Sequence, residues 1–272
     1  MLAPYVLSTL LQRGALGAAA ALPVALLARR ADSLSTSGAV AAVVVGAASV
    51  AAGWAWGALL IVYFVAGSAL SHFRRADKER LTGAVVAKGG ARDATQVLAN
   101  GGIFAASAFL APFGPSHFGV TMSIGALGAL AAASADTWST EIGTLFGGVP
   151  RSLVSFRRVP AGTSGGVSIA GSLAMACGAA LIAVTAALLG LPRVITIVIM
   201  AGIAGAVADS LLGACVQERR WCAACERGSE RRMHDCGTAT VLLDGHEWVD
   251  NDVVNLLATV TGAAVAGVLA VF

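Results

Sequence analysis

The stretch FGVTMSIGALGALAAASADTWSTEIG, residues 118–143, joins a long apolar run to a short polar segment. Residues 118–135 contain no charged side chain, and a helix of this length and composition suits a bilayer crossing. The run ends at Asp136-Thr137-Trp138-Ser139-Thr140-Glu141, which carries two carboxylates and three hydroxyls. These are hard oxygen ligands of the kind that Mg²⁺ prefers. The alternative is a capped and frayed helix end without a ligand.

The composition of the whole chain indicates a membrane protein. Of its 272 residues, 57% are hydrophobic and 12% are charged, and the mean hydropathy is +0.80. A water-soluble protein of this composition would have too few polar residues to cover its surface. The 33 glycines and the alanine runs favour helices that pack closely in a bilayer. The net charge of +3 lies in loops between apolar spans, so no nucleic-acid partner is expected.

Eight apolar segments predict an all-α fold, a polytopic transmembrane bundle of about eight helices. They cover residues 4–28, 37–53, 54–71, 94–111, 118–135, 166–190, 194–213 and 252–272. The first is followed closely by another apolar span, which favours a membrane helix over a cleaved signal peptide. Residues 1–272 are therefore expected to form a single integral membrane domain, with a cytoplasmic loop at about 215–250 that contains cysteine and histidine.

The distribution of basic residues predicts the orientation of these spans. With eight crossings, all of the 18 lysines and arginines except Arg13 and Arg193 fall in loops on one face. Positive charge marks the cytoplasmic face, so both termini are expected to be extracytoplasmic. The protein is then expected in a bacterial-type inner membrane, or in a thylakoid or plastid-type membrane, with its site on the cytoplasmic face.

Five acidic residues lie at the same predicted membrane edge: Asp93, Asp136, Glu141, Asp209 and Asp252. A carboxylate at membrane depth costs roughly 2.5 kcal/mol or more, so it persists where it pairs, binds a cation or takes part in a reaction. The alternative for each is an ordinary interfacial residue, and Asp93 and Asp252 also suit helix N-termini. Because amides and hydroxyls accompany them, we interpret the five acids as candidates for a site.

Amide side chains extend this polar layer. Gln96 and Asn100 follow Asp93 at helical spacing, and Asn251 and Asn255 share a helix face with the nearby aspartate at position 252. These side chains either bind a ligand or join helices through hydrogen bonds. The sequence favours neither interpretation over the other.

The segment Arg157-Arg158-Val159-Pro160-Ala161-Gly162-Thr163-Ser164-Gly165-Gly166 leads into the sixth predicted span. Glycine lets backbone N–H groups approach an anion, and a helix N-terminus carries partial positive charge. Thr163 or Ser164 can cap that helix. The segment lacks the P-loop pattern. Together with the acidic helix end at the same membrane edge, it predicts a phosphate-binding turn.

The loop at about 215–250 contains Cys222-Ala223-Ala224-Cys225 and His234-Asp235-Cys236. A C-x-x-C pair followed by a histidine and a third cysteine suits a structural zinc ion. The alternative is a set of reduced side chains without a metal. No catalytic role is expected for these four residues.

Together the motifs resemble a membrane-protein family that includes the phytyl-phosphate kinase of vitamin E synthesis. The resemblance is carried by residues 92–102, 135–143, 159–168, 209–214 and 251–255. It implies transfer of a phosphoryl group from a nucleoside triphosphate, CTP or ATP with CTP expected, to an isoprenyl monophosphate such as phytyl phosphate. The implied cofactor is Mg²⁺, and the implied partners are the nucleotide, the isoprenyl phosphate and the lipid bilayer.

The residue types and the resemblance together predict a role for each candidate. Asp136, Glu141, Asp209 and Asp252 are expected to bind Mg²⁺ and, with Asp93, to form the catalytic set. Substrates are expected to contact Lys88, Arg92, Gln96, Asn100, Thr137, Thr140, Arg157, Arg158, Gly162, Thr163, Ser164, Gly165, Gly166, Asn251 and Asn255. The acceptor is already an anionic phosphate, so no strong general base is needed.

An ion-coupled membrane transporter is the main alternative function, because intramembrane acids and amides also form ion pathways. A transporter would place polar groups near the middle of the membrane in two related halves. Here they gather at one predicted edge, without a convincing internal repeat. A CTP-dependent lipid cytidylyltransferase would use similar groups but release pyrophosphate. A non-catalytic scaffold is disfavoured by the concentration of acids.

Overall fold

The computed structural model describes residues 4–82 and 90–271 of the protein. Within these residues lie nine α-helices: α1 (Pro4–Arg30), α2 (Thr36–Ala52), α3 (Trp54–His72), α4 (Arg75–Thr82), α5 (Ala94–Leu110), α6 (Ser116–Phe146), α7 (Ile169–Leu188), α8 (Ile195–Cys215) and α9 (Asn251–Leu269). A 3₁₀ turn, η1 (Ala111–Phe113), follows α5. Seven helices among the described residues are long and apolar enough to cross a membrane, and α2 is a shorter apolar helix. The predicted all-α membrane bundle is confirmed, and α4 is an additional helix.

Helix α6 forms the centre of the bundle. Its residues from Ile124 to Ala135 are all buried, and it packs against α5, α7, α8 and α9. The contact with α9 depends on small residues, since a Cβ added to Gly128 would lie 2.3 Å from the carbonyl oxygen of Gly262. Helices in a membrane associate through close backbone contacts of this kind. The glycine and alanine content of the chain therefore serves helix packing.

Helix α6 also continues past the predicted end of its membrane span. It has 31 residues. At 1.5 Å per residue its length is roughly 46 Å, whereas the hydrocarbon layer is about 30 Å thick. Asp136 and Glu141 lie in the part that exceeds a bilayer-length segment, within the same unbroken helix. Their spacing along that helix decides which neighbours they meet.

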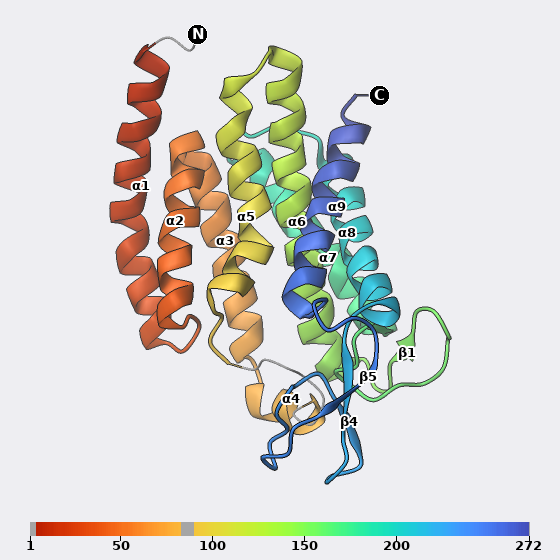
Figure 1. Ribbon diagram of the computed structural model, residues 1–272. Coiled ribbons are helices and arrows are strands. Elements are labelled where there is room, and N and C mark those ends of the chain that lie inside the picture. The colour runs from red at the N-terminus through yellow and green to blue at the C-terminus, as the bar shows by residue number, and fades with distance from the viewer. Residues whose placement is uncertain (1–3, 83–89, 272) are drawn as a thin grey trace.

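The two ends of the bundle are different (Figure 1). Helix α1 begins and α9 ends at one end of the bundle, where the connection from α5 to α6 also lies. Helix α4 and the strands gather at the opposite end. This arrangement agrees with two termini on the same side of the membrane. That this side is extracytoplasmic stays a prediction from the charge distribution.

Two small antiparallel sheets lie at the end of the bundle opposite the termini. Strand β1 (Arg151–Ser152) pairs with β2 (Gly166–Val167). Strand β3 (Arg219–Cys222) lies between β4 (Arg227–Ser229) and β5 (Val241–Asp244). The sequence predicted only loops here, because strands of two to four residues are too short to show an alternating pattern.

Candidate functional site

A polar cavity of about 390 Å³ lies where the ends of α3, α5, α6, α8 and α9 meet. Helix α4 and the loop between α6 and α7 also contribute to its wall. The predicted site residues that line it are Arg92, Gln96, Asn100, Asp136, Thr137, Thr140, Glu141, Gly162, Thr163, Ser164, Gly165, Gly166, Asp209, Asn251 and Asn255. The fold thus brings segments from five predicted spans into one cavity.

Four other predicted site residues are described by the structure and do not line this cavity. Arg157 and Arg158 are exposed in the connection between β1 and β2. Asp93 and Asp252 lie at the starts of α5 and α9, outside the lining of the cavity. Lys88 lies outside the described residues. The acids that the sequence grouped in one layer therefore fall into two structural groups.

The first group is centred on Asp136 in α6 and Asp209 in α8. Their carboxyl groups lie within hydrogen-bond distance of each other. Asp209 Oδ1 is buried and has no hydrogen-bond partner among the described residues. Two carboxylates this close repel each other unless a proton or a cation lies between them. This donor set fits a cation bound by hard oxygen ligands, such as Mg²⁺.

Glu141 is held by groups from α3 and α4. Lys78 Nζ donates to Glu141 Oε2, and the Ser71 hydroxyl donates to Glu141 Oε1 at 2.5 Å. Lys78 is only 8% exposed, and it also donates to the carbonyl oxygens of Leu70 and Ser71 at 2.7 and 2.8 Å. A buried carboxylate with a lysine partner is neutralised within the fold. Glu141 was predicted to bind a metal ion, and the sequence did not indicate that Lys78 would pair with it.

Arg92 is fixed by the segment that connects α1 to α2. Its backbone N–H donates to the carbonyl of Ser33 at 3.0 Å, and its carbonyl accepts from the N–H of Ser35 at 2.9 Å. Its guanidinium donates to the hydroxyls of Ser68 and Ser71 in α3 at 3.2 and 3.3 Å. These side-chain partners are neutral, so they orient the guanidinium without cancelling its charge. Arg92 is therefore suited to bind an anion in the cavity.

The glycine-rich turn at 162–166 does not begin a helix. Helix α7 starts at Ile169, and its N-cap is Ser168, which accepts from the N–H of Gly171 at 3.1 Å. The expectation that Thr163 or Ser164 caps this helix is therefore wrong. The reason is that the preceding residues pair with β1 as strand β2, which delays the helix.

Two positions of the turn require glycine. Gly162 and Gly165 have φ values of +85° and +78°, a region that side chains with a Cβ rarely adopt. A Cβ on Gly165 would also lie 2.5 Å from the Cβ of Ala214 in α8. The N–H groups of Thr163 and Gly166 donate within the loop. The turn is thus a folded loop packed on α8, with part of its N–H groups already in use.

The second group of acids joins α5 to α9. Asp93 is the N-cap of α5 and forms a capping box with Gln96, with both hydrogen bonds at 3.0 Å. The Thr95 hydroxyl lies 2.7 Å from Asp93 Oδ1 and 2.8 Å from Asp252 Oδ2. Asp252 therefore turns towards α5, whereas the two asparagines in the first turns of α9 line the cavity. The sequence had placed these three α9 residues on one face.

Three residues in or beside the cavity were missed by the sequence reasoning. Glu230 follows β4, lines the cavity and accepts a hydrogen bond from the Ser164 hydroxyl at 2.5 Å. Lys78 counted only as one basic residue of its loop, and Ser71 lay inside an apolar span. No local pattern marks any of the three, because their partners lie more than sixty positions away in the sequence.

Cys222, Cys225, His234 and Cys236 converge at the end of the bundle opposite the termini. Their candidate ligand atoms all lie within 4.8 Å of one another, and the sulfurs of Cys222 and Cys236 are 3.6 Å apart. A tetrahedral zinc site with Zn–S bonds of about 2.3 Å separates its sulfurs by about 3.8 Å. The cluster could therefore bind a metal ion such as zinc, as the spacing predicted.

Hydrogen bonding distinguishes two thiols of this cluster. Hydrogen bonds with Thr238, and a further one with His234, lower the pKa of Cys236 to about 6. Hydrogen bonding with Cys236 and burial raise the pKa of Cys225 to about 11. Cys236 is thus the thiol that loses its proton first, and a thiolate is the form that binds zinc.

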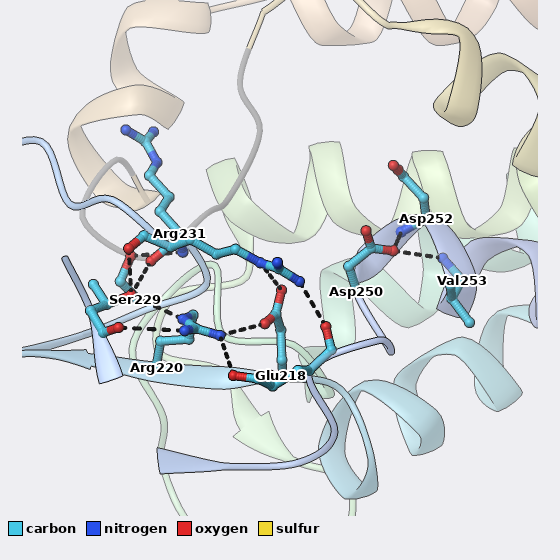
Figure 2. Close-up of polar contacts among 10 residues, drawn as sticks. Glu218, Arg220, Ser229, Arg231, Asp250, Asp252 and Val253 are labelled. Atoms are coloured by element: carbon cyan, nitrogen blue, oxygen red, sulfur yellow. Dashed lines mark hydrogen bonds and ion pairs between the residues drawn. The ribbon is translucent and has the colours of Figure 1, made fainter. Parts of the chain in front are cut away.

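A buried ion pair supports the sheet that carries the cysteine–histidine cluster (Figure 2). Arg220 in β3 donates to Glu218 Oε2 at 2.8 Å and to the Thr240 hydroxyl at 3.0 Å. The side chains of Arg220 and Glu218 are 10% and 6% exposed. In the same view, Asp250 accepts from two N–H groups in the first turn of α9. Because Arg220 precedes Cys222 in β3, the ion pair fixes the strand that carries the first cysteine.

Similarity to known proteins identifies the family. The family model described as "Integral membrane protein DUF92" matches residues 19–263. The chain belongs to the DUF92 family. The matched region contains every residue that lines the polar cavity. The cavity is therefore part of the DUF92 domain.

Several relatives of this DUF92 protein are known. Protein PGR of Arabidopsis thaliana is 28% identical over 264 residues, which is 88% of this chain and 90% of that protein. Protein VTE6, chloroplastic, from the same plant is 27% identical over 238 residues, 86% of this chain and 64% of that protein. Uncharacterized membrane protein MJ0933 of Methanocaldococcus jannaschii is 40% identical over 129 residues, 47% and 52% of the two chains. No solved structure matches the chain significantly.

Proposed function

We propose that this DUF92 protein transfers a phosphoryl group from a nucleoside triphosphate to an isoprenyl monophosphate. The observation that carries the proposal is one cavity lined by the facing carboxyl groups of Asp136 and Asp209, by Arg92 and by the turn at 162–166. The motifs resemble the phytyl-phosphate kinase family, which favours CTP as donor and phytyl phosphate as one acceptor. The similarity to Protein VTE6 supports a prenyl-phosphate kinase without selecting one substrate.

Asp136 and Asp209 are the strongest candidates to hold Mg²⁺, and Glu141 is a further candidate in the same cavity. Asp252, which the sequence also predicts as a ligand, does not line the cavity. When bound, the ion would neutralise the negative charge that develops on the nucleotide phosphates. Asp136 and Asp209 come from α6 and α8, two helices packed against each other. A rigid contact of this kind keeps ligands in place during the reaction.

Arg92 supplies positive charge to the same cavity, whereas the charge of Lys78 is paired with Glu141. In the proposed step, a phosphate oxygen of the acceptor forms a bond to the γ-phosphorus of the nucleotide. The bond from that phosphorus to the β–γ bridging oxygen breaks, and the nucleoside diphosphate leaves with the electron pair. Phosphoryl transfer depends mainly on position and charge neutralisation. The acceptor enters as an anion, so no side chain has to remove a proton.

The position of the polar residues favours this reaction over transport. The cavity is lined by helix ends and loops, whereas a transport site is expected near the middle of the helices. A lipid cytidylyltransferase would use a similar arrangement of acids and cations. Its products are a CDP-lipid and pyrophosphate, so the two transferases are separated by their products.

The test uses the purified protein in detergent with Mg²⁺, a panel of isoprenyl monophosphates, and CTP or ATP labelled in the γ-phosphate. The expected products are labelled prenyl diphosphate and nucleoside diphosphate. Release of labelled pyrophosphate with formation of a CDP-lipid would identify a cytidylyltransferase instead. No product with either donor, together with ion-dependent uptake in liposomes, would favour a transporter.

A further inference from the structure

A second cavity, of about 490 Å³, lies among α1, α2, α3 and α5. We call it the apolar chamber. Its wall comes mainly from apolar and small residues of these four helices, with Arg92, Gln96 and Asn100 as its polar members. The chamber therefore suits a hydrocarbon rather than a nucleotide.

The apolar chamber and the polar cavity meet at Arg92, Gln96 and Asn100, which line both. The guanidinium of Arg92 lies 5.9 Å from the centre of the Phe64 ring, which faces the chamber. Asn100 Nδ2 donates to the carbonyl of Gln96 at 2.9 Å, so this junction has an ordered polar lining. A cation at the boundary between an apolar and a polar space matches a molecule with a long hydrocarbon tail and an anionic head.

We infer that the apolar chamber holds the isoprenyl tail of the acceptor, with Arg92 at the point where its phosphate enters the polar cavity. The inference rests on the proposed function for the class of acceptor. It adds the location of the tail, the residue at the junction and the length of tail that the chamber can enclose.

The chamber limits the tail along α3. Its lining residues on that helix run from Phe64, beside the junction, to Trp54 at the far end. Ten residues of helix span about 15 Å, roughly half the thickness of the hydrocarbon layer. A tail longer than the chamber has to leave through its open side.

The open side of the chamber faces away from the bundle core. Ala20 in α1 and Ala58 and Ile61 in α3 line the chamber and are exposed at the same time. Figure 1 shows α1 at the edge of the bundle, beside α2. Exposed apolar residues on a membrane helix contact lipid. A lipid-borne acceptor can therefore enter the chamber sideways from the bilayer.

Two substitutions fill the chamber from different helices. Ala20→Phe and Ala58→Phe each place a ring in the space assigned to the tail. Ala19→Phe and Ala69→Phe are matched controls, because both alanines are exposed on the same two helices and line neither cavity. We expect the two chamber variants to raise KM for a 20-carbon acceptor roughly tenfold, with a smaller rise for a 10-carbon acceptor. In the two control variants, KM for the 20-carbon acceptor and KM for the 10-carbon acceptor should each stay within about twofold of the value for the original protein.

Tail position is also measured without turnover. The probe is a 15-carbon isoprenyl monophosphate with a photoreactive diazirine at the end of its tail, cross-linked to the purified protein in detergent and mapped by mass spectrometry. We expect adducts on chamber residues of α1, α2 and α3, displaced by excess isoprenyl monophosphate and less effectively by the corresponding alcohol. Arg92→Gln should reduce the difference between these two competitors.

The results separate this inference from the proposed function. Specific adducts in the chamber without product from any donor support the tail site while the transfer reaction fails. Product formation with adducts elsewhere on the bundle, or with equal KM changes in chamber and control variants, overturns the tail site and leaves the transfer reaction standing.

Discussion

Two pairs of aspartates lie at one end of this bundle, and their surroundings are different. Asp136 and Asp209 face each other in a polar cavity, and Asp209 Oδ1 is buried without a hydrogen-bond partner among residues 4–82 and 90–271. Asp93 and Asp252 lie on either side of the Thr95 hydroxyl, which joins the starts of α5 and α9. The first pair lines that cavity, whereas each aspartate of the second pair lies outside the lining and directs one carboxylate oxygen at the Thr95 hydroxyl.

The difference shows that an acid at a membrane edge has at least two uses. A carboxylate that caps a helix and accepts from a neighbouring hydroxyl contributes to helix packing. A carboxylate that faces another carboxylate needs a proton or a cation. In sequence all four aspartates sit at the ends of apolar helices and look alike. The groups that surround each carboxylate in the fold distinguish the two pairs.

The largest effect is expected from neutralising the cavity pair. Asp136→Asn or Asp209→Asn should lower the rate of prenyl diphosphate formation by at least about 100-fold, because each removes charge from the proposed cation site. Asp77→Asn is the control, since Asp77 on α4 pairs with Arg74, which precedes the helix, and does not line the cavity. Rate and thermal stability are measured in detergent. Near-normal rates in both cavity variants would remove the pair from the site.

The next effect concerns the buried partner of Glu141. Lys78→Met should destabilise the protein by about 3 kcal/mol, because it leaves a mostly buried carboxylate without its cation. The rate of transfer should fall roughly 30-fold, since Glu141 is then misplaced. The double variant Lys78→Met with Glu141→Gln should recover part of the stability but not the rate. Recovery of both would show that the ion pair serves packing alone.

A smaller effect is expected from the cysteine–histidine cluster. Cys222→Ser should remove bound zinc, because it deletes one of four converging ligands. The rate should fall about tenfold, as expected when support of a site is lost, since Glu230 reaches the cavity from the same loop. Cys177→Ser on α7 is the control, because this free thiol is exposed outside the cluster. Metal analysis checks occupancy, and absence of zinc in the original protein would contradict the assignment.

The smallest effect on rate is expected at the α5–α9 junction. Asp93→Ala should lower stability by about 1 kcal/mol through loss of the helix cap. The rate should change less than about threefold, because Asp93 does not line the cavity. Thermal unfolding in detergent micelles measures the stability, and the transfer assay measures the rate. A loss as large as that of Asp136→Asn would erase the distinction between the two pairs.

The membrane helices were predictable because hydropathy is a local property. A run such as Ile124–Ala135 reveals its environment through composition alone, since every residue in it has to be compatible with apolar surroundings. Convergence of the four cysteine and histidine residues was also indicated by their spacing. By contrast, α4 is short and polar, and the strands at residues 219–244 lack a long alternating pattern. Neither carries a strong periodic signal.

The polar cavity was predictable only in part. The segment from Asp136 to Glu141 was recognisable from its concentration of oxygen ligands, and Arg92 from its place beside a polar helix stripe. The contact of Lys78 with Glu141 could not be predicted. It joins α4 to α6, which are far apart in the sequence, and no local pattern fixes how two such helices pack. The start of α7 at Ile169 depended on strand pairing, which the sequence reasoning did not foresee.

The pattern of hydropathy and charge along the chain was enough to predict an α-helical membrane protein with its acids and basic residues at helix ends. Apolar length and composition impose that result wherever a chain has to satisfy its backbone inside lipid. The meeting of Asp136 with Asp209, by contrast, became known from the packing of the helices. The same holds for the α5–α9 junction at Asp93 and Asp252 and for the place of Arg92 between a polar and an apolar space. The physical reason is that the surroundings of a side chain are set by helix packing, which depends on contacts between distant segments.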